Sequence, residues 1–200
     1  MAEALLFAAG VIAQTPTGFG LGTNQPPGFA VTLLPGERVG HEQIVRGLIR
    51  SGTNEFMFVV PEGLRTQTPS EGTIVLTSRD MSYYLSIRIV GPAPASPGLQ
   101  EALREQIANQ FPNVSSMEEF TATVANREGT GFQLRQELAK GGSRLIRILW
   151  SPFKAGVLEF ALNANSNSAL AGQGTFDMIL LTFRSNERGR LEFVRRSEKT

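Results

Sequence analysis

Alternating apolar and polar residues dominate the middle of the chain. In the stretch YYLSIRIV, residues 83–90, Leu85 and Ile87 fall on one side and Ser86 and Arg88 on the other. A period of two is typical of β-strands, whose successive side chains point to opposite faces of a sheet. Similar patterns predict strands over residues 56–60, 73–77, 120–126, 132–138, 144–151 and 157–163. Short turns such as AKGGS join the last four strands, so we expect these to be antiparallel neighbours.

Two segments instead repeat apolar residues every three or four positions, which is the period of a helix. The first begins after a capping Ser96 and Pro97 and ends at Pro112. Its apolar stripe consists of Leu99, Leu103, Ile107 and Phe111. The second begins near NANSNSA, and its stripe consists of Phe176, Ile179, Leu180 and Phe183. Each stripe predicts a helix that packs one face on a core.

The first quarter of the chain has a different character. Residues 14–41 are rich in Gly, Pro and Thr, which predicts an extended arm with one short strand over residues 29–34. The stretch EQIVRGLIRS, residues 42–51, places Ile44, Val45, Leu48 and Ile49 on one helical face. This spacing predicts a short amphipathic helix.

An apolar run, ALLFAAGVIAQ, covers residues 4–14. It is too short to span a bilayer, which needs about 20 apolar residues. Its length suits the hydrophobic part of a signal peptide with cleavage after Ala13, although no Lys or Arg precedes it. We expect export, and two alternatives stay open: a retained segment that contacts a membrane, and a short helix packed on the domain. No Cys follows the run, so a lipoprotein anchor is excluded.

The composition excludes several kinds of chemistry. The chain has no Cys, which excludes disulfides, thiolate nucleophiles and Cys-ligated metal sites. His41 is the single histidine, so a Ser-His-Asp triad would have to use it. The net charge of +1 creates no field that attracts nucleic acid. We therefore expect no catalytic residue, no cofactor, no metal and no nucleic-acid partner.

Individual candidates for chemistry each have a simpler structural explanation. His41 follows a glycine and precedes an acid, as an exposed loop residue would, and its partners for catalysis are not identifiable. Asp80 could join a cation site, but Asp is also a common turn residue. Glu118 and Glu119 are not an acid–base pair by their spacing, because adjacent residues on a strand face opposite sides.

Glycine and arginine clusters also favour structural interpretations. Gly20–Gly22 and Gly129–Gly131 lack the strand-to-helix context of a phosphate loop. The strongest basic run could meet phosphates or anionic lipid, or form a solvated tail; it consists of Arg184, Arg188, Arg190, Arg195 and Arg196. The aromatic residues Tyr83, Tyr84 and Trp150 lie in predicted strands, and we expect them in the core or on the sheet surface.

Two motifs carry a resemblance to a known family. The opening strand closes in Val60-Pro61-Glu62-Gly63-Leu64, and the last helix reads FDMILLTF over residues 176–183. With the order of elements, these motifs resemble the PsbP/Mog-like superfamily, which includes DcrB-like periplasmic proteins, over about residues 52–186. The chain departs from the family pattern at Leu64, where an aromatic residue is usual, and in its spacing before Phe183.

The resemblance implies an α+β fold, an antiparallel β-sheet of about six to seven strands with helices on both faces, or α/β/α sandwich. An extended N-terminal arm would precede it. Residues 61–63 would then end an early strand and reverse the chain into the next one. The expected organisation has four parts: an apolar segment over 1–13, the arm with its short helix over 14–51, the domain over 52–186 and a basic tail over 187–200.

The resemblance also implies a class of function. Members include extrinsic subunits of photosynthetic membrane complexes and envelope proteins, so we expect a non-catalytic exported accessory subunit that docks on a protein partner. That partner could be a membrane complex, even a photosynthetic one, with the protein in the periplasm or on an extracytoplasmic membrane face. One alternative is a cytoplasmic chaperone of the same fold that binds apolar helices. A second alternative is a hydrolase that uses His41.

Overall fold

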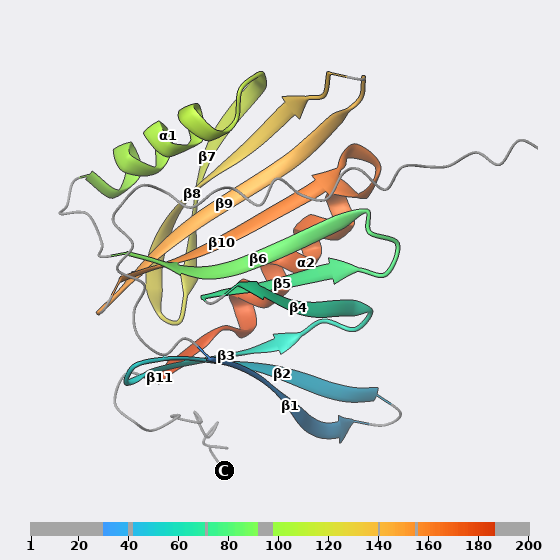
Figure 1. The fold of residues 1–200 in the computed structure, drawn as a ribbon, viewed down its shortest axis with the longest axis vertical. Helices are drawn as coiled ribbons and strands as arrows, with labels where there is room; N and C mark the ends of the chain where they lie inside the picture. The colour runs from blue at the N-terminus through green and yellow to red at the C-terminus, as the bar shows by residue number, and fades with distance from the viewer. Residues whose placement is uncertain are drawn as a thin grey trace, which may run out of the picture.

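Two antiparallel sheets and two helices form the part of the chain that the computed structural model describes, namely residues 30–39, 42–70, 72–91, 98–139, 141–154 and 156–186 (Figure 1). The larger sheet has seven strands in the order β4 (Leu64–Ser70), β5 (Thr73–Ser78), β6 (Tyr83–Val90), β10 (Gly156–Asn165), β9 (Ser143–Phe153), β8 (Arg127–Glu137) and β7 (Val114–Val124). The smaller sheet has the order β1 (Ala30–Val39), β2 (Glu42–Ser51), β3 (Asn54–Val60) and β11 (Arg184–Asn186). The helices are α1 (Gly98–Gln110) and α2 (Ala169–Thr182), and a short 3₁₀ turn, η1 (Ser166–Ser168), precedes α2.

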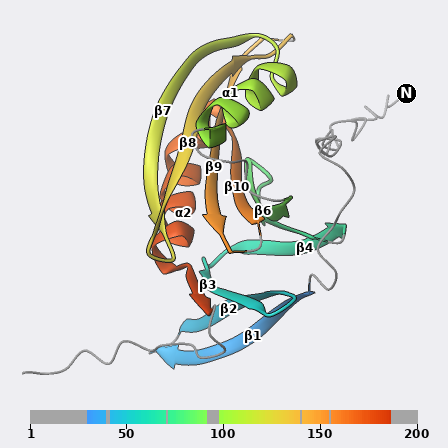
Figure 2. The same ribbon diagram turned by 90° about the vertical axis from the view of Figure 1, so that its left-hand side faces the viewer.

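The two faces of the seven-stranded sheet bury separate hydrophobic clusters. One face packs against α2 and the smaller sheet, and the other packs against α1 (Figure 2). Along β10, Leu158, Phe160 and Leu162 belong to the first cluster, whereas Val157 belongs to the second. This alternation places helices on both faces, so the predicted α+β fold class is confirmed. The second, four-stranded sheet was not predicted.

The predicted helix over residues 42–51 is wrong, because this segment is strand β2. It pairs with β1 on one side and β3 on the other, so residues 30–39 and 42–51 are part of a sheet. Gly47 lies under the Phe58 ring, where an added Cβ would come within 2.5 Å of the ring. Ile44, Val45 and Ile49 are β-branched and favour strands, and pairing on both edges outweighs the helical spacing.

The turn after β3 moves the chain from one sheet to the other. Pro61 follows the last residue of β3, and Gly63 has φ +83°, a left-handed conformation that glycine adopts without strain. The sequence motif therefore does end a strand and redirect the chain, as predicted. The next strand, β4, was not predicted, and it joins the seven-stranded sheet at its edge.

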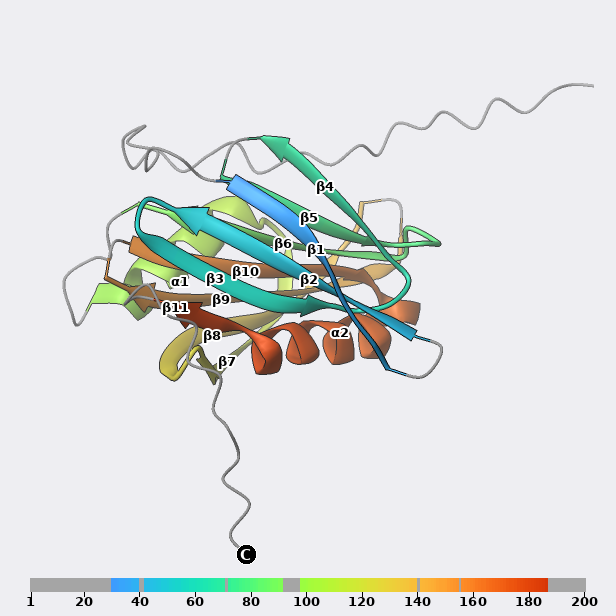
Figure 3. The same cartoon turned by 90° about the horizontal axis from the view of Figure 1, so that it is seen from below.

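A cluster of phenylalanines joins the two sheets and α2. Phe183, directly after α2, is fully buried. Its ring lies 5.7 Å from Phe56 and 5.8 Å from Phe58, both on β3, and 4.9 Å from Phe160 on β10. In Figure 3, β3 lies beside α2, in agreement with their contacts, and β11 continues from the end of the helix to pair with β3. One residue thus contributes to the packing of three elements.

Several sequence predictions lie outside the described residues. They concern the apolar segment and most of the arm, within residues 1–29, and the basic tail over residues 187–200. Neither α1 nor α2 is long and apolar enough to cross a membrane.

Candidate functional site

The outward side of α2 is an apolar surface, which we call the outer stripe. Its residues are Leu170, Ala171, Gly174, Met178 and Leu181. Leu170 is 83% exposed, Leu181 is 74% exposed and Met178 is 47% exposed. The opposite side of the same helix buries the predicted residues Phe176, Ile179 and Leu180. Contiguous exposed apolar patches mark interaction sites on soluble proteins.

The polar side chains of α2 are used to attach the helix to the sheets. Gln173 Nε2 donates to Gln133 Oε1 on β8 at 2.8 Å, and Asp177 Oδ1 accepts from Arg147 Nη1 on β9 at 2.9 Å. A 3.1 Å hydrogen bond links Thr175 to the hydroxyl of Tyr83 on β6. Thr182 Oγ1 accepts from the backbone N–H of Val59 at 3.2 Å. Because these polar side chains of α2 form hydrogen bonds with the strands, the outer stripe is almost entirely apolar.

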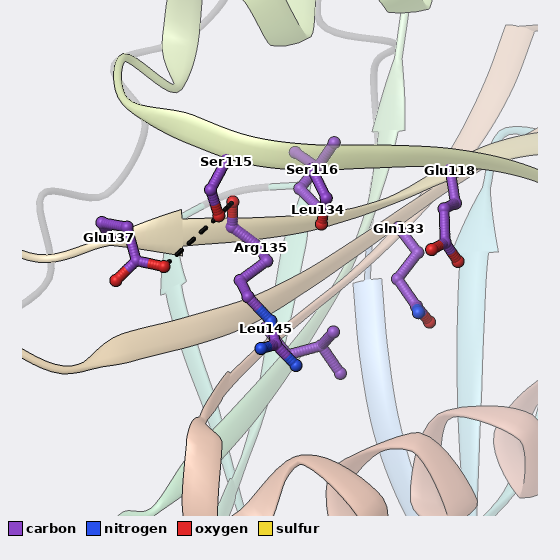
Figure 4. Close-up of a pocket in the computed structure, with 8 residues that line it drawn as sticks. All are labelled: Ser115, Ser116, Glu118, Gln133, Leu134, Arg135, Glu137 and Leu145. Carbon is purple, nitrogen blue, oxygen red and sulfur yellow. Dashed lines mark hydrogen bonds between the residues drawn. The ribbon is translucent and has the colours of Figure 1, made fainter.

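A hollow of about 470 Å³, the acidic hollow, lies at one end of the seven-stranded sheet, on the face that carries α2 (Figure 4). Its polar lining includes Glu118 from β7 and Arg135 and Glu137 from β8. Two carboxylates and one guanidinium give it a net negative charge. In Figure 4 the Ser115 hydroxyl lies between β7 and β8, where it donates to the Arg135 carbonyl at 3.1 Å and to Glu137 Oε1 at 3.3 Å.

A second hollow of about 340 Å³, the apolar hollow, lies on the opposite face between α1 and β7. Its lining includes Ile107, Ala108 and Phe111 near the end of α1 and Met117 on β7. Arg104 stands at its side, where Nη2 lies 3.5 Å from Glu119 Oε2 and the guanidinium lies over the Phe132 ring. The two hollows therefore flank the same strand and differ in chemistry.

A buried carboxylate, Glu159, was not singled out from the sequence. It is 3% exposed under α1, and Oε1 accepts from Arg88 Nε at 2.7 Å. Its Oε2 accepts from Trp150 Nε1 at 2.9 Å and from Gln106 Nε2 of α1 at 3.2 Å. A lone acid in the apolar stretch VLEFALN was the available signal. Since these donors satisfy the carboxylate, we interpret Glu159 as the group that ties α1 to the sheet.

The structure places the acidic candidates as separate groups. Asp80 lies in the turn between β5 and β6, where Oδ1 accepts from the backbone N–H of Ser82 at 3.1 Å. Hydrogen bonds from Ser78 and Ser82 hold the pKa of Asp80 below its usual value. Glu118 and Glu119 face opposite sides of β7, one in the acidic hollow and the other beside Arg104 and Gln100. In the described part of the chain, no group of three acidic or histidine side chains could hold a metal ion.

The remaining candidates are also accounted for where the structure describes them. Gly129 and Gly131 lie inside strand β8, in close contact with β9. Tyr84 is half-buried on β6, where burial raises the pKa of its hydroxyl. Arg184 Nη1 donates to the carbonyls of Leu181 and Phe183 at the end of α2. His41, Gly20–Gly22 and the other tail arginines lie outside the described residues.

Comparison with known proteins finds solved structures that are similar to this one. No protein-family model and no curated protein matches the sequence. Similar solved structures include LpqN, involved in cell envelope biogenesis of Mycobacterium tuberculosis, with a TM-score of 0.48, 13% identity and coverage of 78% of this chain and 91% of that one. The cyanobacterial PsbP protein CyanoP from Synechocystis has a TM-score of 0.45, 13% identity and coverage of 66% and 86%. PA94, a protein of unknown function from Pseudomonas aeruginosa, has a TM-score of 0.41, 11% identity and coverage of 74% and 91%.

A PsbP protein is among these structures. The likeness concerns the arrangement of strands and helices.

Proposed function

We propose that this protein is a non-catalytic accessory subunit that docks on a protein partner through the outer stripe of α2. The observation that carries the proposal is the exposure of Leu170, Met178 and Leu181 on a helix whose other side is firmly packed. Interfaces combine an apolar centre with a polar rim. Here Asp177, at 60% side-chain exposure, and Arg184 border the stripe and supply such a rim.

The stripe is pre-organised for binding. Hydrogen bonds that involve Gln173, Thr175 and Thr182, and the packing of Phe176, fix the orientation of α2 on the sheets. A rigid helix loses little conformational entropy when a partner binds, so its apolar side chains contribute more of their burial energy to affinity. This favours a docking role for the helix.

We further propose that docking takes place on the extracytoplasmic side of a membrane. Support for this location comes from the apolar run over residues 4–14, which has the length of a signal-peptide core. Gentle purification of the full chain from membrane and soluble fractions, with measurement of its intact mass, tests this point. A chain that is cytosolic and uncleaved would favour the chaperone hypothesis. The hydrolase hypothesis remains a prediction, because His41 lies outside the described residues.

Introducing charge into the stripe tests the docking surface. We expect Leu170→Glu and Leu181→Glu together to weaken partner binding at least tenfold, about 1.4 kcal/mol. The free energy of unfolding should change by no more than about 0.5 kcal/mol, because both side chains are exposed. Photo-crosslinking from position 181 in the source cells should capture the partner, and crosslinking from position 81 should not.

Met81 is the matched control, since it is 76% exposed in the turn between β5 and β6. A double variant that keeps full affinity for the captured partner would contradict the proposal. A crosslinked product with twice the mass of the chain would show that the outer stripe binds a second copy of this protein and not a different partner.

A further inference from the structure

Strand β7 forms an edge of the seven-stranded sheet and pairs with β8 alone among the described strands. It is 11 residues long, and the side chains of Ser115–Glu119 are all exposed. The outer edge of such a strand presents backbone N–H and C=O groups that can pair with another extended segment. Main-chain pairing of this kind is a common mode of peptide recognition, in which pockets for alternate side chains give specificity.

The two hollows lie on the two faces of this edge. Ser115 and Ser116 line both of them, so each hollow opens beside the same part of β7. Side chains of an added strand would alternate between the two faces. One set would reach the acidic hollow with Glu118 and Glu137, and the other set would reach the apolar hollow with Ile107 and Phe111.

We propose that the β7 edge binds an extended segment of a partner protein, in which basic and apolar residues alternate, as an eighth strand of the sheet. The net negative charge of the acidic hollow selects Lys or Arg at every second position. The apolar hollow selects aliphatic side chains at the positions between, because Arg104 is already engaged by Glu119 and Phe132. The site uses none of the outer-stripe residues, so it does not rest on the proposed docking through α2.

A second copy of the chain fits this edge poorly. Two β7 strands paired with each other would bring Glu118 and Glu119 of both copies close together, and like charges on paired strands are destabilising. This repulsion disfavours self-association and favours a basic partner at the same edge.

A synthetic peptide with the sequence Lys-Val-Lys-Val-Lys-Val-Lys, blocked at both ends and labelled with fluorescein, is the probe. Its binding to the full chain is measured by fluorescence anisotropy at low and at physiological salt. We expect the alternating peptide to bind at least tenfold more tightly than a peptide with the same composition arranged as Lys-Lys-Lys-Lys-Val-Val-Val. Two further peptides carry N-methyl groups on the odd-numbered or on the even-numbered residues. Since only one of these two sets of N–H groups can pair with β7, we expect methylation of that set to abolish binding and methylation of the other set to leave binding unchanged.

Charge variants of the protein locate the site. Glu118→Lys should weaken binding at least tenfold, and Glu118→Gln should weaken it less. Glu62→Lys is the matched control, because Glu62 is an exposed glutamate in the turn after β3, and it should leave affinity unchanged. The thermal midpoint of each variant shows whether it is folded.

Three results would overturn the proposal. Equal affinity of the alternating and the block-ordered peptide would show that charge alone drives binding. Binding of both N-methylated peptides would show that no backbone pairing occurs. Unchanged affinity in both Glu118 variants would place the peptide elsewhere. The Leu170→Glu and Leu181→Glu variant should bind the peptide as well as the unmodified chain, which separates this site from the outer stripe.

Discussion

At the scale of single residues, Gly172 and Gly174 lie two positions apart in α2 in opposite surroundings. Gly172 is buried against β10, and an added Cβ there would lie 3.1 Å from Leu162 Cδ1 and 3.2 Å from Ala164 Cβ. Gly174 is exposed, and an added Cβ would meet nothing within 4 Å. The first glycine allows close approach of helix and sheet, whereas the second only lowers helix propensity.

We therefore expect opposite effects from the same substitution at these two positions. Gly174→Ala should raise the free energy of unfolding by about 0.5–1 kcal/mol, because alanine is the better helix former. Gly172→Ala should lower it by about 1 kcal/mol, because overpacking against Ala164 outweighs the gain in propensity. Urea denaturation of both variants measures the difference, and stabilisation at position 172 would mean that α2 can move away from β10.

Residue-scale chemistry was only partly predictable from the sequence. The opposite orientation of Glu118 and Glu119 follows from strand geometry and is confirmed, because it depends on local periodicity alone. The role of Glu159 was missed because its partners Arg88, Gln106 and Trp150 come from three different elements. Only the folded arrangement brings them together.

At the scale of elements, both apolar packing and a buried hydrogen bond attach α1 to the seven-stranded sheet. Leu103 and Ile107 pack on the sheet, and Gln106 reaches the buried Glu159. Among the described strands, α1 contacts mainly β8. Removing the carboxylate should therefore loosen the helix more than removal of an exposed acid would.

We expect Glu159→Met to lower the free energy of unfolding by about 3 kcal/mol, because it removes the carboxylate that faces Arg88 in a buried setting. The double variant Glu159→Met with Arg88→Met should recover part of this loss. Hydrogen exchange should show faster exchange in α1 of the single variant, and Glu101→Met on the exposed side of α1 is the control. An unchanged exchange rate in α1 would show that Glu159 does not hold the helix.

Helices and strands were predictable where the periodicity of the sequence agrees with the packing of the folded protein. Strands β5, β6 and β10 and both helices lie close to their predicted ranges, and in β5 and β6 the alternating apolar residues are also the buried ones. Strand β2 was mistaken for a helix because its apolar residues fit both periods, and pairing with β1 and β3 decided the outcome. Strand β4, LRTQTPS, carries little apolar signal and was missed for that reason.

At the scale of the whole molecule, Phe183 joins the two sheets into one packed unit. Its ring contacts β3 of the smaller sheet and β10 of the larger one, and β11 begins at the next residue. Since both sheets share this cluster, we expect them to unfold in one cooperative transition and not separately.

Truncation of this ring tests the expectation. Phe183→Ala should lower the free energy of unfolding by about 3–5 kcal/mol, the usual cost for a buried phenylalanine. Leu181→Ala, two positions earlier and 74% exposed, should change it by less than about 0.5 kcal/mol. Circular dichroism and Trp150 fluorescence should follow one thermal transition, and separate transitions would show that the sheets are independent.

The pairing of β3 with β11 also has a consequence for the order in which the protein is made. Asn186 donates to Glu55 Oε2 across 131 positions of sequence, and Phe183 completes a cluster that Phe56 and Phe58 begin. A ribosome releases β3 long before α2 and β11, and contacts this distant in sequence form slowly. A nascent chain that has not yet reached Phe183 therefore carries an incomplete sheet, in which Phe56 and Phe58 are accessible to chaperones.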